Sequence, residues 1–233
     1  MNALPKFRLD RTRLATPQVL ERLREAIMAL DLAPGTVLAR QELAEQFGVS
    51  QTPVREALMR LNEEGLVDVF PQHATLVSRI DIGAARQAHF LRRAIELELV
   101  RELALQPPAG LVQALERQIA LQQALAEAQQ YGEFVAADRR FHQLLYEAGG
   151  MAALVDLVGR VSGHVDRLRR LHLPTAGKTA SILRDHRAIV AGIAAGGPQA
   201  AQEALRAHLS GTLSAVEEIR RLHPDYVVDE GAV

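Results

Sequence analysis

Apolar residues recur three or four positions apart over most of this chain, which is the spacing of one face of an α-helix. The first such run covers residues 17–30 and ends before Pro34-Gly35. Two shorter runs follow between Arg40 and Leu66, with Gly48 between them. Gly48 can adopt the positive φ of a tight turn, and Ser50 can cap the next helix with its side-chain oxygen. The pattern predicts two short helices joined by a tight turn.

A strand-like alternation follows from Val67 to Val77, with a turn expected at Pro71. A helix-turn-helix followed by a hairpin forms a winged helix, whose second helix presents its first residues to the major groove of DNA. Here those residues are Gln51, Thr52 and Arg55. The alternative is an ordinary pair of antiparallel helices in an α-rich protein.

The rest of the chain repeats the helical spacing with no strand pattern, and prolines or glycines stand between the runs. It predicts a mainly α protein in which an antiparallel bundle of six helices follows the winged helix. The predicted bundle helices cover residues 84–105, 110–130, 133–148, 151–173, 179–195 and 199–222. In the fourth of these, Val161 belongs to the expected inward stripe. The predicted division is an N-terminal arm (1–16), a DNA-binding domain (17–79), a helical domain (84–222) and a C-terminal tail (223–233).

Composition limits the possible functions. With 233 residues and 48% hydrophobic residues, the chain can bury one large core or two modest ones. It has no cysteine, which excludes disulfides and thiolate metal sites and fits the cytoplasm. No apolar run is long enough for a membrane span, so no membrane partner is expected. Residues 1–79 carry as many basic as acidic side chains, so contact with DNA phosphates must come from local placement.

Three histidines and one aspartate are predicted to face the interior of the bundle. Asp138 and His142 lie four residues apart on one helix face, and His186 and His208 lie on the apolar faces of two later helices. A divalent metal ion would satisfy all four side chains at once. Alternatively, each histidine is a core residue bonded to a carbonyl group, and Asp138 with His142 is a simple hydrogen-bonded pair. The residues alone leave these two interpretations balanced.

Three segments of the sequence also resemble a known protein family. The segment LAPGTVLARQELAEQFGVSQTPVREALMRLNEEGLV resembles the DNA-binding domain of the GntR family of bacterial regulators. DRRFHQLLYEAGG and DHRAIVAGIAAGGPQAAQEALRAHL resemble the FCD effector domain of its FadR subfamily. The resemblance implies a homodimer on a palindromic operator. It also implies a divalent ion, zinc first and otherwise nickel, manganese, cobalt or iron, bound by Asp138, His142, His186 and His208.

The same resemblance implies a site for a small carboxylate effector, for example a sugar acid. Arg92 or its neighbour Arg93 matches a basic residue that can face the ligand cavity, although a surface arginine beside Glu96 is an equal alternative. His164 is a further candidate for the cavity, with a plain core role as its alternative. The residues expected to contact DNA are Arg40, Gln41, Ser50, Gln51, Thr52, Pro53, Arg55 and His73.

Two positions depart from the family pattern at the DNA-binding end. Many relatives have arginine where this chain has Gln51, and Arg-Gly in the wing where it has His73-Ala74. A glutamine favours adenine over guanine, because its amide can form two hydrogen bonds with an adenine edge. We therefore expect an altered operator preference.

The sequence thus predicts a cytoplasmic transcriptional regulator whose DNA binding is controlled by an effector at a metal site. A metal-dependent hydrolase or lyase built on the bundle is the alternative from the enzyme class. Against it, the sequence predicts no further inward carboxylate near the four candidate ligands to act as a general base. A metal-storage or scaffold protein is a third possibility, which specific operator binding would exclude.

Overall fold

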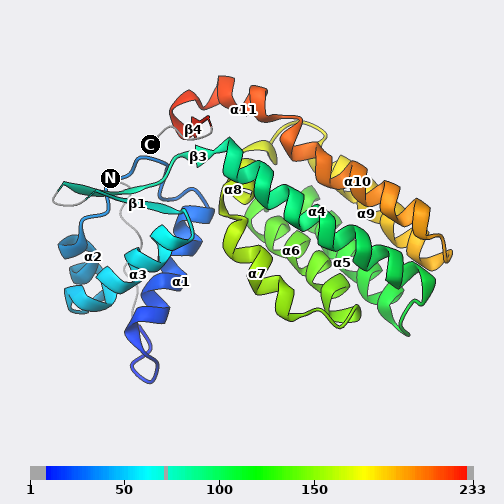
Figure 1. Ribbon diagram of the computed structural model, residues 1–233, viewed down its shortest axis with the longest axis horizontal. Helices are drawn as coiled ribbons and strands as arrows, with labels where there is room; N and C mark the ends of the chain where they lie inside the picture. The colour runs from blue at the N-terminus through cyan, green and yellow to red at the C-terminus, as the bar shows by residue number, and fades with distance from the viewer. Residues whose placement is uncertain (1–8, 71–72, 230–233) are drawn as a thin grey trace.

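The computed structural model describes residues 9–70 and 73–229, and it confirms the predicted fold class. At the N-terminal end, three helices pack around a common core (Figure 1). They are α1 (Ala15–Met28), α2 (Arg40–Phe47) and α3 (Gln51–Glu63). Gly48 ends α2 with a φ of 65°, as the tight turn requires. Val54, Leu58 and Leu61 of α3 are buried against α1 and α2, which leaves the opposite face of α3 exposed.

The expected hairpin follows α3. Strands β1 (Val67–Phe70) and β2 (Ala74–Val77) are antiparallel, with Val67 opposite Val77 and Phe70 opposite Ala74. The backbone at Val37 bridges to Leu76 and so attaches the segment before α2 to the wing. The turn expected at Pro71 lies outside the described residues, as do residues 1–8 of the arm and 230–233 of the tail.

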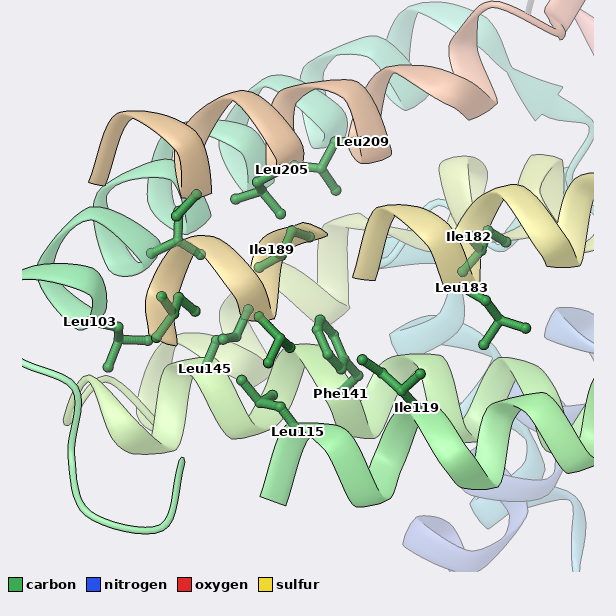
Figure 2. Packing of buried hydrophobic residues seen from close by; sticks show 14 of the residues in the cluster. Leu103, Leu115, Ile119, Phe141, Leu145, Ile182, Leu183, Ile189, Leu205 and Leu209 are labelled. Carbon is green, nitrogen blue, oxygen red and sulfur yellow. The ribbon is translucent and has the colours of Figure 1, made fainter. Parts of the chain in front are cut away.

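Helices α4 to α10 form the second domain, shown on the right of Figure 1. The long helix α4 crosses the bundle and contacts α6, α8, α9 and α10. Helices α5 and α6 pack against each other, as do α9 and α10. Figure 2 shows the aliphatic core between them, in which Phe141, Leu145 and Ile189 are fully buried. The five longest helices of this domain are α4 (Ile82–Leu105), α5 (Leu111–Glu127), α6 (Tyr131–Ala148), α9 (Lys178–Ala194) and α10 (Pro198–Leu213).

Two predicted helices are each divided in two. Residues 151–173 form α7 (Ala153–Val161) and α8 (Gly163–His172). Gly163 lies against the N-terminal domain, where an added Cβ would come within 2.6 Å of a methyl group of Leu66. The break turns α8 toward that domain, and Val161 is 43% exposed instead of inward.

The second division follows α10, where Ser214 and Ala215 interrupt the helix before α11 (Val216–Leu222). Val216 and Ile219 of α11 are buried in a separate small core with Ile80 and Ile82. A continuous helix would carry these side chains past that core. Burial of apolar area at the domain boundary therefore favours the break.

The C-terminal segment also differs from the sequence prediction, which expected no strand after residue 79. A short 3₁₀ helix, η1 (Pro224–Tyr226), leads into strand β4 (Val227–Val228). This strand pairs in parallel with β3 (Ile80–Asp81), so the segment returns to the connection between the domains. Two-residue strands carry too little periodicity to be recognised in a sequence. Among the described residues, no helix is both long and apolar enough to cross a membrane.

Candidate functional site

The surface predicted to bind DNA is built from the starts of α2 and α3 and from the wing. Arg40 and Gln41 open α2, and Gln51, Thr52 and Arg55 lie on α3; all are exposed. Gln41 donates a hydrogen bond of 3.1 Å to Glu45 on the same helix. The exposed side chains at the start of α3 lie where they can reach base edges or phosphates.

Three further DNA-binding candidates complete that surface. Ser50 occupies the N-cap position of α3, but its side chain makes no capping hydrogen bond, contrary to the prediction. Its exposed hydroxyl is therefore available to another partner. Pro53 is half-buried in the first turn of α3, and His73 is exposed beside the turn of the wing.

A buried polar cluster lies inside the helical domain. Asp138 and His142 come from α6, His186 from α9 and His208 from α10, and all four are at most 8% exposed. One ligand atom from each lies within 4.8 Å of the others. His208 Nε2 lies 3.2 Å from His142 Nε2 and 3.4 Å from His186 Nε2. His186 Nε2 lies 3.5 Å from Asp138 Oδ1. The structure thus brings together the four predicted ligands.

The Nδ1 atoms of His186 and His142 point away from the centre of the cluster, and each lies close to an oxygen atom that can orient the ring. His186 Nδ1 is 2.9 Å from the amide oxygen Oε1 of Gln122, and His142 Nδ1 is 2.9 Å from Oε2 of Glu96. Each Nδ1 faces an oxygen atom, an arrangement that favours the proton on Nδ1 and a lone pair on Nε2 directed into the cluster. Asp138 Oδ1 has no hydrogen-bond partner there. These groups fit a cation, because buried acceptors without a donor are costly.

The protonation states suit a cation as well. Burial lowers the pKa of His186 to about 3 and that of His208 well below its usual value. Burial opposes ionisation of Asp138, but the charge of Arg169 above all holds its pKa below the normal range. Neutral imidazoles and an ionised carboxylate are the forms that bind metal ions.

Glu96 of α4 is a candidate site residue that the sequence interpretation missed, since it predicted no further inward carboxylate. The side chain of Glu96 is 1% exposed. It accepts a hydrogen bond of 2.7 Å from Arg92 Nε and one of 3.4 Å from the hydroxyl of Tyr146. Burial alone would raise the pKa of Glu96, but the charge of Arg92 and its hydrogen bond to the carboxylate lower it to about 2. Glu96 therefore joins a candidate ligand to the arginine expected at the effector site.

The structure distinguishes between the two arginine candidates for the effector site. Arg92 is buried beside the cluster, so the alternative of a surface arginine is wrong. Arg93 is exposed and does not line the cavity. The spacing of Arg92, Glu96, Leu99 and Leu103 was the available signal, because these positions share one face of α4.

A cavity of about 930 Å³ extends from the cluster to the DNA-binding domain. Asp138, His142 and His208 line its inner part, together with Arg92 and Arg169. Its outer part is lined by side chains of α1 and α3 as well as α7. The volume is sufficient for a small organic ligand beside the cluster.

His164 does not line this cavity, contrary to its assignment as an effector residue. It lies at the domain boundary, where its Nδ1 accepts a hydrogen bond of 3.1 Å from the backbone N–H of Asp81. An added Cβ on Gly65 would come within 3.1 Å of the imidazole. The neighbouring Arg167 is fully buried and donates to the carbonyl of Ser78 at 2.7 Å. Sequence periodicity did not reveal these contacts, because they join two domains.

The chain matches two family descriptions. Residues 15–77 match "Bacterial regulatory proteins, gntR family", and residues 87–211 match "FCD domain". A similar protein from Streptomyces ambofaciens, an HTH-type transcriptional regulator in an unstable DNA locus, is 36% identical over 211 residues, covering 91% of this chain and 89% of that protein. The HTH-type transcriptional repressor RspR of Escherichia coli (strain K12) is 30% identical over 222 residues, covering 95% and 97% of the two chains.

Two solved structures have the same fold. E. coli McbR/YncC superposes with a TM-score of 0.74 at 20% identity, covering 88% of this chain and 98% of the other. A putative transcriptional regulator GntR from Rhodococcus sp. RHA1 gives a TM-score of 0.73 at 22% identity, covering 87% and 97%.

Proposed function

Because this chain belongs to the GntR family of transcriptional regulators with an FCD domain, we propose that a small carboxylate at a metal centre in its helical domain controls its binding to operator DNA. The family and the similar proteins are DNA-binding regulators and not enzymes. The observation that carries the proposal is the convergence of three imidazole Nε2 atoms and Asp138 Oδ1 at the edge of a cavity, which Asp138, His142 and His208 line.

The DNA-binding role is assigned to residues 17–79. Exposure of Gln51, Thr52 and Arg55 on α3, opposite its buried face, supports contact with the major groove. Arg40, Gln41, Ser50 and His73 are placed at the edges of the same domain, where phosphate contacts would position the protein. A single winged helix makes limited contact with DNA, so a homodimer on a palindromic operator is part of the proposal.

The metal centre is assigned to Asp138, His142, His186 and His208. Three nitrogen ligands and one carboxylate suit zinc, and also nickel, cobalt, manganese or iron. When bound, the ion would supply positive charge and open coordination positions for a ligand carboxylate. Glu96 and Gln122 orient the His142 and His186 rings from the outside, a support that such sites commonly have.

The effector is assigned to the cavity beside these four residues. Arg92 and Arg169 both line it, so a carboxylate there would meet a guanidinium group as well as the ion. Both arginines already have carboxylate partners, Glu96 and Asp138. A ligand therefore changes existing ion pairs when it binds. A regulator with two binding sites requires such a change, because a ligand at one site can affect the other site only if it stabilises one conformation of the protein more than another.

Hydrolase or lyase activity is not supported. Glu96 supplies the inward carboxylate that the sequence prediction lacked, but it is held between Arg92 and His142 and not directed at an open position.

The cytoplasm is the proposed location, as expected for a regulator that must reach chromosomal DNA.

The proposed function can be tested with the purified full chain. Metal content is first measured by elemental analysis, and operator sequences are then selected from random DNA. Affinity for the selected DNA is compared with and without a chelator, and across a panel of small carboxylic acids including sugar acids. We expect one equivalent of a divalent ion and a metal-dependent response to at least one acid. A metal-free protein that still responds to a carboxylate would contradict the metal centre.

A further inference from the structure

Helix α8 is only ten residues long, yet it contacts both the polar cluster and the DNA-binding domain. Arg169 on one side of the helix reaches Asp138 in the cluster. Arg167 on another side reaches Ser78, which lies between the wing and α4. The two residues are two positions apart, so they point away from the helix in different directions. The helix thus joins a candidate metal ligand to the connection between the domains.

At the cluster, Arg169 is an ion-pair partner of Asp138. One of its nitrogens donates to Oδ2 of Asp138, and another lies 3.3 Å from Oδ1 of Asp166 on α8 itself. A divalent cation at Asp138 Oδ1 would compete for the charge that now attracts Arg169. Occupancy of the cluster therefore changes the force that holds α8 against α6.

At the domain boundary, Arg167 makes a set of fully buried contacts. Its guanidinium donates to the Ser78 carbonyl at 2.7 Å and to the Ser78 hydroxyl at 3.0 Å. The same hydroxyl donates to the carbonyl of Gly65 at 2.6 Å, so Arg167 also holds the end of α3 through Ser78. His164 Nδ1 accepts from the backbone N–H of Asp81, the N-cap residue of α4. Such buried polar contacts have defined geometry and are costly to leave unmade.

Two glycines beside these bonds allow a close approach of α8 to the residues that follow α3. A Cβ on Gly163 would come within 2.6 Å of Leu66 Cδ2, and one on Gly65 within 3.1 Å of His164 Nε2. Closely packed elements transmit displacement to each other instead of absorbing it. A shift or rotation of α8 must therefore move residues 65–66 or break the bonds to Ser78.

We propose that α8 couples the metal centre to the winged helix, with Arg169 as its contact to the cluster and Arg167 as the positioning residue that holds the DNA-binding domain through Ser78. This inference rests on the proposed metal centre. It assigns to Arg167 a role in orientation of the winged helix and none in contact with the metal, effector or DNA.

Hydrogen–deuterium exchange with mass spectrometry on the full chain tests the proposal, with zinc as the only added probe after removal of metal by a chelator. In the original protein, zinc should slow amide exchange in α6, α9 and α10 and also alter exchange in residues 64–82. In Arg167→Met, the effect in the bundle should remain and the effect on residues 64–82 should be lost. Ser78→Ala, which removes one acceptor without adding bulk, should reduce that effect even if Arg167→Met does not fold.

Arg170→Met is the matched control, because it removes the same charge from α8 at a residue with no bond to Asp138 or Ser78. It should respond to zinc as the original protein does. If zinc protects the bundle but leaves residues 64–82 unchanged in the original protein, the coupling role of α8 is wrong and the metal centre stands. The same conclusion holds if Ser78→Ala and any folded Arg167→Met retain the full effect. If zinc protects nothing in the original protein, the metal centre itself is wrong and this inference is overturned with it.

Discussion

The Nε2 atoms of His142 and His208 lie 3.2 Å apart in the interior of the helical domain. The outer nitrogen of His142 faces Glu96 Oε2 at 2.9 Å, so with the His142 proton on that side, only His208 can place a proton between the two rings. That proton cannot also serve His186 Nε2 and Asp138 Oδ1, which face the same point. A bound cation would satisfy all four groups.

Removal of one candidate ligand should therefore remove the metal. We expect His186→Ala to lower zinc affinity by more than ~100-fold, since loss of an outer partner alone costs roughly 10- to 100-fold. The ring of His186 stacks on Phe141 at 3.9 Å, so the variant also loses packing in the core. Elemental analysis checks the metal, and circular dichroism checks the fold. Operator affinity without effector should survive if the bundle stays folded; a full complement of metal in the variant would contradict the assignment.

Replacement of Glu96 tests the outer support of His142. Glu96→Gln removes the charge beside His142 and Arg92, and zinc affinity should fall by roughly 10- to 100-fold. Competition with a chromophoric chelator measures this affinity. Glu98→Gln is the control, because Glu98 lies on the same helix but pairs with Arg101 at the surface. Equal zinc affinity in both variants would remove Glu96 from the site.

Arg55 is the side chain of α3 that we expect to contribute most to operator binding. Arg55→Ala should weaken binding to the selected DNA by about 1–3 kcal/mol without change in stability, because the side chain is exposed. A gel-shift titration at fixed salt measures the change. Arg60→Ala is the control on the same helix, since Arg60 lines the cavity near the other end. An equal loss in the two variants would mean that Arg55 contributes only general charge.

The boundary histidine should make stability depend on pH. Burial and the charge of Arg167 lower the pKa of His164 to about 4, whereas the unfolded chain has a pKa of 6.5. As the pH falls from 6.5 toward 4, the unfolded state takes up a proton that the folded state does not. The free energy of unfolding should therefore fall by at most about 3 kcal/mol over this range. Above pH 6.5, His164 is unprotonated in both states and should not affect stability.

Thermal unfolding at several pH values measures this effect. His164→Asn keeps an acceptor near the backbone N–H of Asp81 but has no proton to gain, so its melting temperature should fall less between pH 7 and pH 5 than that of the original protein. Parallel pH profiles of the two proteins would show that His164 does not titrate at the boundary.

Assembly is the last testable point. One winged helix per chain predicts a homodimer that reads two half-sites related by its own two-fold axis. Light scattering at micromolar concentration should give twice the mass of the 25.5 kDa chain. A monomer of this size that binds a palindrome tightly would contradict the prediction.

The sequence by itself determined the classes of structure. Gly48 between two short apolar runs and the alternation around Val67 are local signals, because turn geometry and strand periodicity depend on neighbouring residues. The pairing of Asp138 with His142 is also local, since residues four apart share a helix face. These signals predicted the winged helix and the helical domain, but they left a metal site and ordinary core roles balanced for the four candidate ligands, and the family resemblance favoured the metal site.

Only the tertiary structure showed which residues the apolar and polar helix faces contact. Periodicity shows which residues of α4 share a side, but not that the side with Arg92 and Glu96 packs on the cluster. His164 and Arg167 follow the same helical pattern as core residues, yet they bond to Asp81 and Ser78 in the connection between the domains. Contacts of this kind depend on how two separately folded cores dock. No spacing within one helix records that docking, because the partners lie more than 80 residues apart in the chain.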